Sequence, residues 1–135
     1  MNHRTIIVFD FETTSKSKYT CELTQIAAAA IHPRRLTIID TFNSECRPTD
    51  FDAIEEEALK ITRKTKDGLA KAPCVDQVWQ DFANYVNSHN YKKTEWYAPI
   101  AAGYNINGYD WEILNRYARK YKDINEKNEQ KLFSN

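Results

Sequence analysis

The feature that most constrains this chain is an apolar segment that ends in two acidic residues. Thr5 to Phe11 is rich in β-branched and aromatic residues, which favours a strand buried in the centre of a sheet. Asp10 and Glu12 stand at its carboxyl end, and alternation of side chains along a strand points both carboxylates the same way. They are either solvated turn residues or, because like charges this close repel, ligands of a hard divalent cation such as Mg²⁺ or Mn²⁺.

A second segment, far away in the sequence, has a related organisation. Residues 98–103 predict a short buried strand, and residues 104–110 form a polar, glycine-containing turn. Apolar residues at helical spacing then follow from Trp111 to Tyr121. Asp110 stands where this helix would begin, a favourable place for a carboxylate. It is therefore either a simple helix N-cap or a third member of the acidic site.

Together the two segments resemble the motifs of the DEDD superfamily of 3′→5′ exonucleases, which includes proofreading exonucleases. Phe9–Thr14 resembles the first motif and Gly103–Asp110 the second. The spacing from Asn105 to Asp110 is one residue longer than in the His-Asn-x-x-Phe-Asp form. It is similar to the Tyr-Asn-x-x-x-Phe-Asp form found in exonuclease domains of family B polymerases. The resemblance extends through the intervening chain to about Tyr121.

The resemblance implies an α/β fold of the ribonuclease-H-like class. Its mixed sheet combines an antiparallel hairpin with parallel strands, is flanked by helices, and places the fourth strand beside the first. From the sequence pattern we expect strands over residues 5–11, 22–31, 36–46 and 96–102, although Ala27 to Ala30 would also suit a helix. We expect helices with apolar faces over residues 51–61 and 75–86, and one from Asp110 that runs through Ile124 towards Phe133.

The resemblance also implies the site. Two metal ions about 4 Å apart would assist phosphodiester hydrolysis, and Asp10, Glu12 and Asp110 would be the catalytic and metal-binding residues. Asp10 would bridge the ions, Glu12 would hold the ion that activates water, and Asp110 would hold the other. The residues implied to bind substrate are Thr13, Thr14, Tyr104 and Asn105. For Tyr104 and Tyr109 the alternative is ordinary half-buried packing.

One departure from the family lies near the C-terminus. The family carries a fourth acidic residue on a last helix, preceded by a His or Tyr that helps to activate water. No His follows His89, and Asp123 is the only Asp after Asp110, with no Tyr or His at the expected offset before it. We therefore expect residues 1–135 to form a single, C-terminally truncated exonuclease-like domain without the last strand and helix of the family.

Three interpretations follow from this departure. The chain is the N-terminal part of a metal-dependent exonuclease that is incomplete or weakly active, or a C-terminal partner segment supplies the missing helix. The third interpretation is a non-catalytic domain of exonuclease ancestry that binds nucleic acid or protein. A missing fifth strand would leave the strand near residues 98–102 as an apolar sheet edge, so a homo-oligomer is also expected.

The composition limits which binding partners and which cellular compartment can be expected. The net charge is zero, so any nucleic-acid surface must be local. The candidate basic clusters are Lys60, Arg63, Lys64 and Lys66, and Arg116, Arg119, Lys120 and Lys122, with solvated helix faces as the alternative. The implied substrate is the 3′ end of single-stranded nucleic acid, DNA in preference to RNA. Three unevenly spaced cysteines and no signal peptide or apolar span predict an intracellular, cytoplasmic protein in a reducing compartment, away from membranes.

Overall fold

The computed structural model describes residues 4–103, 106–121 and 132–134. Its elements are β1 (Ile6–Thr13), β2 (Leu23–Ile31), β3 (Ile38–Glu45), α1 (Glu56–Thr62), α2 (Lys66–Ala70), α3 (Val75–Ser88), β4 (Ile100–Ala102) and α4 (Trp111–Lys120). Short 3-10 turns stand at Phe51–Ala53 and Glu95–Tyr97, and a π-helical turn precedes α4 at Ile106–Asp110. None of the helices in these described ranges has the length and apolar character needed to cross a bilayer.

The four described strands form one mixed sheet in the order β3-β2-β1-β4. β1 pairs antiparallel with β2, β2 pairs antiparallel with β3, and β1 pairs in parallel with β4. The expected arrangement, an antiparallel hairpin with the fourth strand beside the first, is therefore confirmed. Parallel pairing of β1 and β4 brings their carboxyl ends to the same end of the sheet, where ligand sites of such sheets lie.

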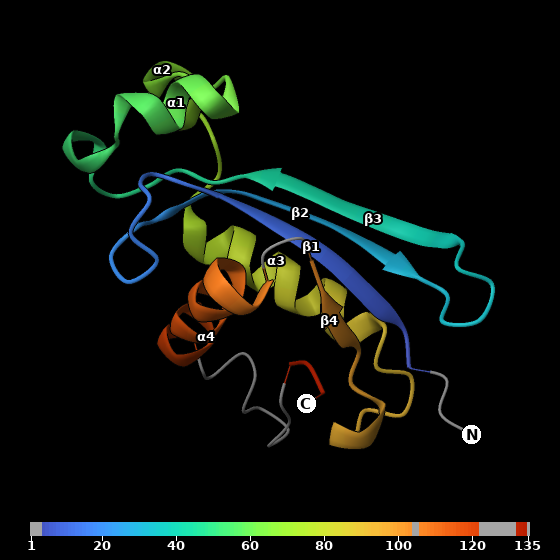
Figure 1. The fold of residues 1–135 in the computed structure, drawn as a ribbon. Coiled ribbons are helices and arrows are strands. Elements are labelled where there is room, and N and C mark those ends of the chain that lie inside the picture. Colours follow the sequence, from blue (N-terminus) through green and yellow to red (C-terminus); the bar gives the residue numbers. More distant parts are fainter. Residues whose placement is uncertain (1–3, 104–105, 122–131, 135) are drawn as a thin grey trace.

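The helices α3 and α4 lie on one side of the sheet, and α1 and α2 lie beyond the end where β1 and β3 finish (Figure 1). Ile7, Phe9 and Phe11 of β1 point into the core beneath α3, where Phe82 meets both phenylalanine rings. Val8 of β1 is 41% exposed on the other face. The expectation that β1 is a central strand is confirmed, since β2 and β4 flank it, although the described helices cover only one of its two faces.

Several expected boundaries differ from the structure. The segment 51–61 is broken by extended backbone at Ile54, so its apolar residues do not form one helix face, and Ile61 is 68% exposed. The fourth strand begins at Ile100 because Glu95–Tyr97 forms a 3-10 turn. The segment Ala27–Ala30 lies in β2, so its helical alternative is wrong.

The C-terminal end of the chain also departs from expectation. α4 ends at Lys120, with Tyr121 in a non-helical conformation, and Ile124 lies outside the described residues. Ser134 pairs in parallel with Ile100, and its backbone N–H donates to Pro99 O at 3.0 Å. The outer edge of β4 is thus occupied at this point by the chain itself, which contradicts the expected bare edge.

Phe133 anchors this returning segment in the core. It is buried, and its ring stacks on that of Phe9 with centroids 5.6 Å apart. Leu132 is buried as well. Stacked, buried aromatic rings contribute area burial and a specific ring–ring attraction, so these residues hold the C-terminal segment against β1 and β4.

Candidate active site

Asp10 and Glu12 lie on the uncovered face of β1, near its carboxyl end. They alternate with the buried Phe9 and Phe11, so both carboxylates point away from the core, as their spacing predicted. Asp10 is exposed and Glu12 is half-buried. The pairing register shifts between Glu12 and Thr13, where β1 begins to leave the sheet. Such irregularities often re-aim side chains at the end of a strand.

Asp110 reaches the site from the second segment. It is the last residue of the π-helical turn that separates β4 from α4, and it is 4% exposed. Its backbone is already helical, at φ −64° and ψ −36°, and its side chain makes no capping hydrogen bond. Asp110 thus stands at the N-cap position of α4 without the hydrogen bond by which a capping side chain acts. Single π-helical turns occur often at functional sites, and a buried carboxylate without a capping role needs another explanation.

The charges of the three carboxylates interact. Burial, followed by the charges of Asp10 and Glu12, raises the pKa of Asp110 to about 7. Burial, followed by the charge of Asp10 and a side-chain hydrogen bond with it, also raises the pKa of Glu12, and Lys64 opposes this shift. Asp110 is therefore close enough to the first segment to be influenced by the charges of Asp10 and Glu12, as expected for a site that attracts cations.

Charge interaction reaches further than metal coordination. Among the described residues, no three His, Cys, Asp or Glu side chains lie close enough together to hold a metal ion as they stand. Asp10 and Glu12 share a hydrogen bond, but a shared cation requires that the oxygens of all its ligands come within about 2–2.6 Å of it. The donor set therefore fits Mg²⁺ or Mn²⁺ by its chemistry, while the side chains stand further apart than coordination requires.

Tyr109 holds the Asp110 turn against the exit of β1. Its hydroxyl donates to Ser15 O at 2.7 Å and lies 2.7 Å from Thr13 Oγ1. Burial raises the pKa of Tyr109 to about 12, so the hydroxyl keeps its proton and can donate. Lys18 Nζ adds a bond to Gly108 O at 2.9 Å. Tyr109 therefore does more than the half-buried packing that the sequence left as its alternative.

α4 is held to the start of β2 by two further polar contacts. The hydroxyl of Tyr117 accepts the backbone N–H of Leu23 at 3.0 Å, and Arg116 donates to Cys21 O. Because Asp110 immediately precedes α4, these bonds help to fix its position relative to β1. Nothing in the sequence motifs identifies them, since each joins a helix residue to a segment far away in the sequence.

The expected substrate-binding residues occupy different positions. Thr13 lies at the site and contacts Tyr109. Thr14 is buried, and its hydroxyl accepts the backbone N–H of Glu22 at 3.0 Å. Tyr104 and Asn105 lie outside the described residues.

A pocket of about 360 Å³ adjoins Glu12. The end of β1 forms one wall, Tyr109 contributes to the lining, and α1 forms another wall with Ala58, Ile61 and Thr62. The lining therefore combines apolar carbon and hydroxyl groups with charged groups, which are Glu12 of the site, Glu55, Glu57 and Lys16. Concave sites of this size and mixed character commonly bind small organic groups.

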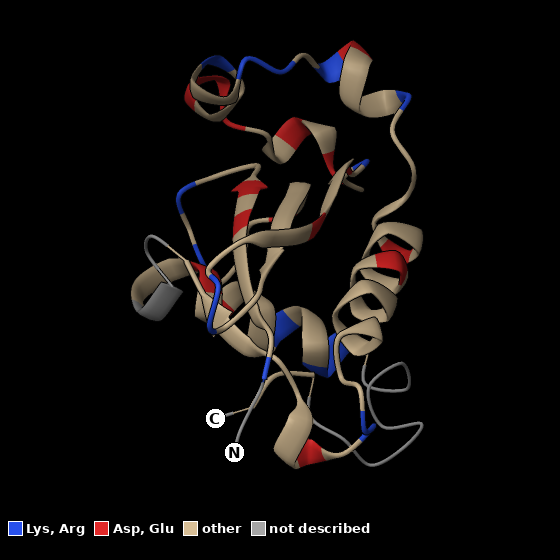
Figure 2. Cartoon of the chain, turned by 90° about the vertical axis from the view of Figure 1, so that its right-hand side faces the viewer, with Lys and Arg blue, Asp and Glu red and all other residues tan. Residues whose placement is uncertain are grey.

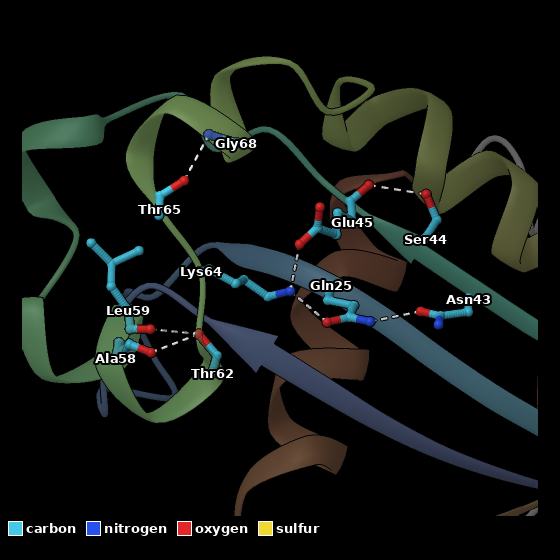
Figure 3. A network of polar contacts seen from close by, with 10 residues as sticks. All are labelled: Gln25, Asn43, Ser44, Glu45, Ala58, Leu59, Thr62, Lys64, Thr65 and Gly68. Carbon is cyan, nitrogen blue, oxygen red and sulfur yellow. Dashed lines mark hydrogen bonds and ion pairs between the residues drawn. The ribbon is translucent and has the colours of Figure 1, made fainter.

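The expected basic cluster around α1 and α2 is not a uniform positive patch. Figure 2 shows residues of both charge signs on the α1 and α2 segments, where Glu55, Glu56 and Glu57 precede the lysines. Lys64 is drawn inward: its ammonium donates to Gln25 Oε1 at 2.6 Å and to Glu45 Oε2 at 2.7 Å (Figure 3). Lys122, in the second cluster, lies outside the described residues.

Comparison with known proteins adds a family match. A model of the exonuclease family matches residues 7–133. The PolC-type DNA polymerase III of Staphylococcus aureus is 32% identical over 82 residues, which cover 61% of this chain and 5% of that protein. The chain thus spans a small fraction of the length of the curated relatives it matches.

Solved structures agree with the fold. Exonuclease I of E. coli in complex with a dT13 oligonucleotide has a TM-score of 0.69 and 22% identity, over 97% of this chain and 27% of that chain. The nuclease domain of 3′hExo, a DEDDh family member bound to rAMP, has a TM-score of 0.66 and 18% identity, over 89% and 60% respectively. Both share the mixed sheet with flanking helices.

Proposed function

Because this chain belongs to the exonuclease family, we propose that it is a metal-dependent 3′→5′ exonuclease domain acting on the 3′ end of single-stranded nucleic acid. The observation that carries the proposal is the electrostatic coupling of Asp110 to Asp10 and Glu12, beside a pocket. Two sequence-distant segments converge there at the carboxyl ends of parallel strands. Like-charged groups gathered in this way, at a cost to folding, point to a functional site.

Asp10, Glu12 and Asp110 would hold the metal ions, Mg²⁺ or Mn²⁺. Bound ions supply charge neutralisation and water activation to phosphodiester hydrolysis. The chain itself contributes orientation: β1 presents Asp10 and Glu12 on one face, and the bonds of Tyr109 keep the turn before α4 beside them. The carboxylates would draw closer together once a cation offsets their repulsion.

The pocket would receive the terminal nucleotide. Its apolar lining from Phe11, Ala58 and Ile61 suits the face of a base, and the hydroxyls of Thr13 and Tyr109 suit a sugar or phosphate. Tyr104 and Asn105 are proposed to contact the strand as well, whereas the buried Thr14, bonded to Glu22 N–H, would support the turn after β1. DNA is the preferred substrate, because the curated relative is a DNA polymerase and one structural neighbour holds a DNA oligonucleotide.

A non-catalytic nucleic-acid- or protein-binding domain of exonuclease ancestry is the second candidate. The absence of a ready-made metal cluster among the described residues favours it. Asp123, Glu126 and Glu129, the acidic residues of the C-terminal segment, lie outside the described residues. If the fourth acidic residue of the family is missing, as the sequence led us to expect, this chain alone would be weakly active. A C-terminal partner segment or a second copy of the chain would then supply that residue.

Localisation in a cytoplasmic, reducing compartment remains a proposal that the cysteines support. Cys21, Cys46 and Cys74 are free, and the first two are buried. Burial raises the pKa of the Cys46 thiol to about 12, so it stays protonated and unreactive.

Calorimetry with Mn²⁺ tests the site. We expect weak binding by the wild-type chain and none by Asp10→Ala, because the site loses its most exposed carboxylate. Asp81→Asn is the matched control: Asp81 is exposed on α3, and its one bond among the described residues is local, to Gln77. Equal Mn²⁺ affinity in the wild type and Asp10→Ala would refute the assignment.

A trimming assay separates the two functions. Slow, Mg²⁺-dependent shortening of a 3′-labelled single-stranded DNA, lost in Glu12→Gln, is expected of the exonuclease. Retention of the oligonucleotide without any shortening would favour the binding domain.

A further inference from the structure

The helix α1 forms a wall of the pocket without being packed into the core. It contains no buried residue, although Ala58, Ile61 and Thr62 line the pocket. Figure 1 shows α1 beyond the end of the sheet, away from α3 and α4. Helices in proteins gain most of their stability from packing an apolar face. Since α1 itself lacks such a face, its position depends on the buried Ile54 just before its N-terminal end and on polar contacts at both ends.

The contacts at the N-terminal end of α1 are largely exposed. The backbone N–H of Glu55 donates to Thr14 O at 2.9 Å, and the Glu55 carboxylate accepts the backbone N–H of Lys16 at 2.9 Å. Lys16 also pairs with Glu57 at 3.3 Å, with both side chains mostly in solvent. Exposed pairs of this kind contribute little to stability.

The C-terminal end of α1 is fastened differently. Arg63 adopts a left-handed conformation (φ 58°), and the N–H of Lys64 donates to Leu59 O at 2.9 Å. This reversal turns Lys64 towards the sheet, where its side chain is only 7% exposed. Its ammonium bonds to Gln25 of β2 and Glu45 of β3, and Gln25 Nε2 in turn donates to Asn43 Oδ1 at 2.7 Å (Figure 3).

This anchor stands in the same cross-strand row as the acidic site. Glu12 pairs with Gln25 across β1 and β2, and Gln25 pairs with Glu45 across β2 and β3. The single buried ammonium therefore joins the end of α1 to the strand positions beside Glu12. A buried charge is retained only where it is paired, and its removal leaves its partners unsatisfied.

We propose that Lys64 is a positioning residue that fixes α1 as the wall of the pocket and so sets how tightly the terminal nucleotide is held. The nucleotide part of this inference rests on the proposed function; the attachment of α1 does not. Without the ammonium, the C-terminal end of α1 loses its only buried polar link to the sheet among the described residues. The wall then moves away from Glu12 and the pocket widens.

Hydrogen exchange tests the attachment without reference to activity. Lys64→Met keeps the aliphatic stem and removes the charge, and Lys60→Met removes an exposed charge from the same helix. We expect the amides of residues 56–62 to exchange about tenfold faster in Lys64→Met and to be unchanged in Lys60→Met. The slow amides of α3 report whether the fold is intact. Unchanged exchange of α1 in Lys64→Met would overturn the inference.

Binding of thymidine monophosphate in the presence of Mg²⁺ tests the pocket. We expect about tenfold weaker binding in Lys64→Met, with part of the loss restored in Lys64→Arg, which keeps a positive charge. Equal affinities in Lys64→Met and the wild type would overturn the link to the pocket. Faster exchange of α1 together with no binding by the wild type would refute the proposed function and still support the attachment.

Discussion

Replacing Asp110 by Asn should make the metal-free protein more stable, and increasingly so as the pH rises. The folded-state pKa of Asp110 is raised from 3.8 to about 7, so the folded chain holds this proton more tightly than the unfolded chain does. Stability therefore falls as the pH rises from about 4 to about 7. Below this window the carboxyl is neutral in both states, and above it the full penalty of ionisation applies. Asn mimics the neutral carboxyl at every pH.

The size of the effect follows from the same pKa difference. Ionisation at a pKa of about 7 instead of 3.8 corresponds to about 4 kcal/mol at most. Because the neighbouring Asp10 is exposed, solvent screening reduces this to roughly 2 kcal/mol. We expect the free energy of unfolding of Asp110→Asn to exceed that of the wild type by this amount at pH 8 and to equal it near pH 4.

Urea unfolding in EDTA across this pH range measures the difference. Asp81→Asn on the exposed side of α3 is the control and should show no pH-dependent gain. If Asp110 were an ordinary structural residue, Asn would be neutral or destabilising at pH 8, and that result would refute the reasoning. Added Mn²⁺ should reverse the order by stabilising only the wild type.

Two other substitutions test how the site is supported. Phe133→Ala should lower the free energy of unfolding by about 3 kcal/mol, because a buried ring stacked on Phe9 is lost. The control Trp96→Ala, at an 80% exposed residue, should change this free energy by less than about 0.5 kcal/mol. Equal effects of the two substitutions would contradict the packing described. Tyr109→Phe should lower the free energy of unfolding by about 1 kcal/mol, because the hydrogen bond to Ser15 O is lost. It should also weaken Mn²⁺ binding if this bond positions Asp110, and an unchanged Mn²⁺ affinity would exclude that role.

The acidic pair could be predicted because its geometry is local. Alternation along a strand is enough to place Asp10 and Glu12 on one face, and the strand itself is evident from its composition. To predict the position of Asp110, the order of the strands had to be known. The motif resemblance implied that order, and the parallel pairing of β1 with β4 confirmed it. The raised pKa of Asp110 then follows from burial, which no motif reveals.

Other features depended on long-range contacts. The bonds of Lys64 form only when β2 and β3 are paired in register. The sequence alone therefore could not distinguish Lys64 from the other lysines of its cluster. Helix periodicity over 51–61 was misleading because Ile54 adopts extended backbone. One-sided burial of β1 also escaped prediction, since composition does not say how many helices cover a sheet.

The pairing of Phe9 with Phe133 has a consequence for how the chain acquires its structure. The strand that bears the acidic pair is made before the ring that stacks on its phenylalanine, and 124 residues separate Phe9 from Phe133. Contacts so distant in sequence slow folding, and a nascent chain keeps apolar surface open until they form. Chains released before residue 133 would leave Phe9 uncovered on that side, and we expect them to aggregate or be degraded before any ion or nucleotide could bind.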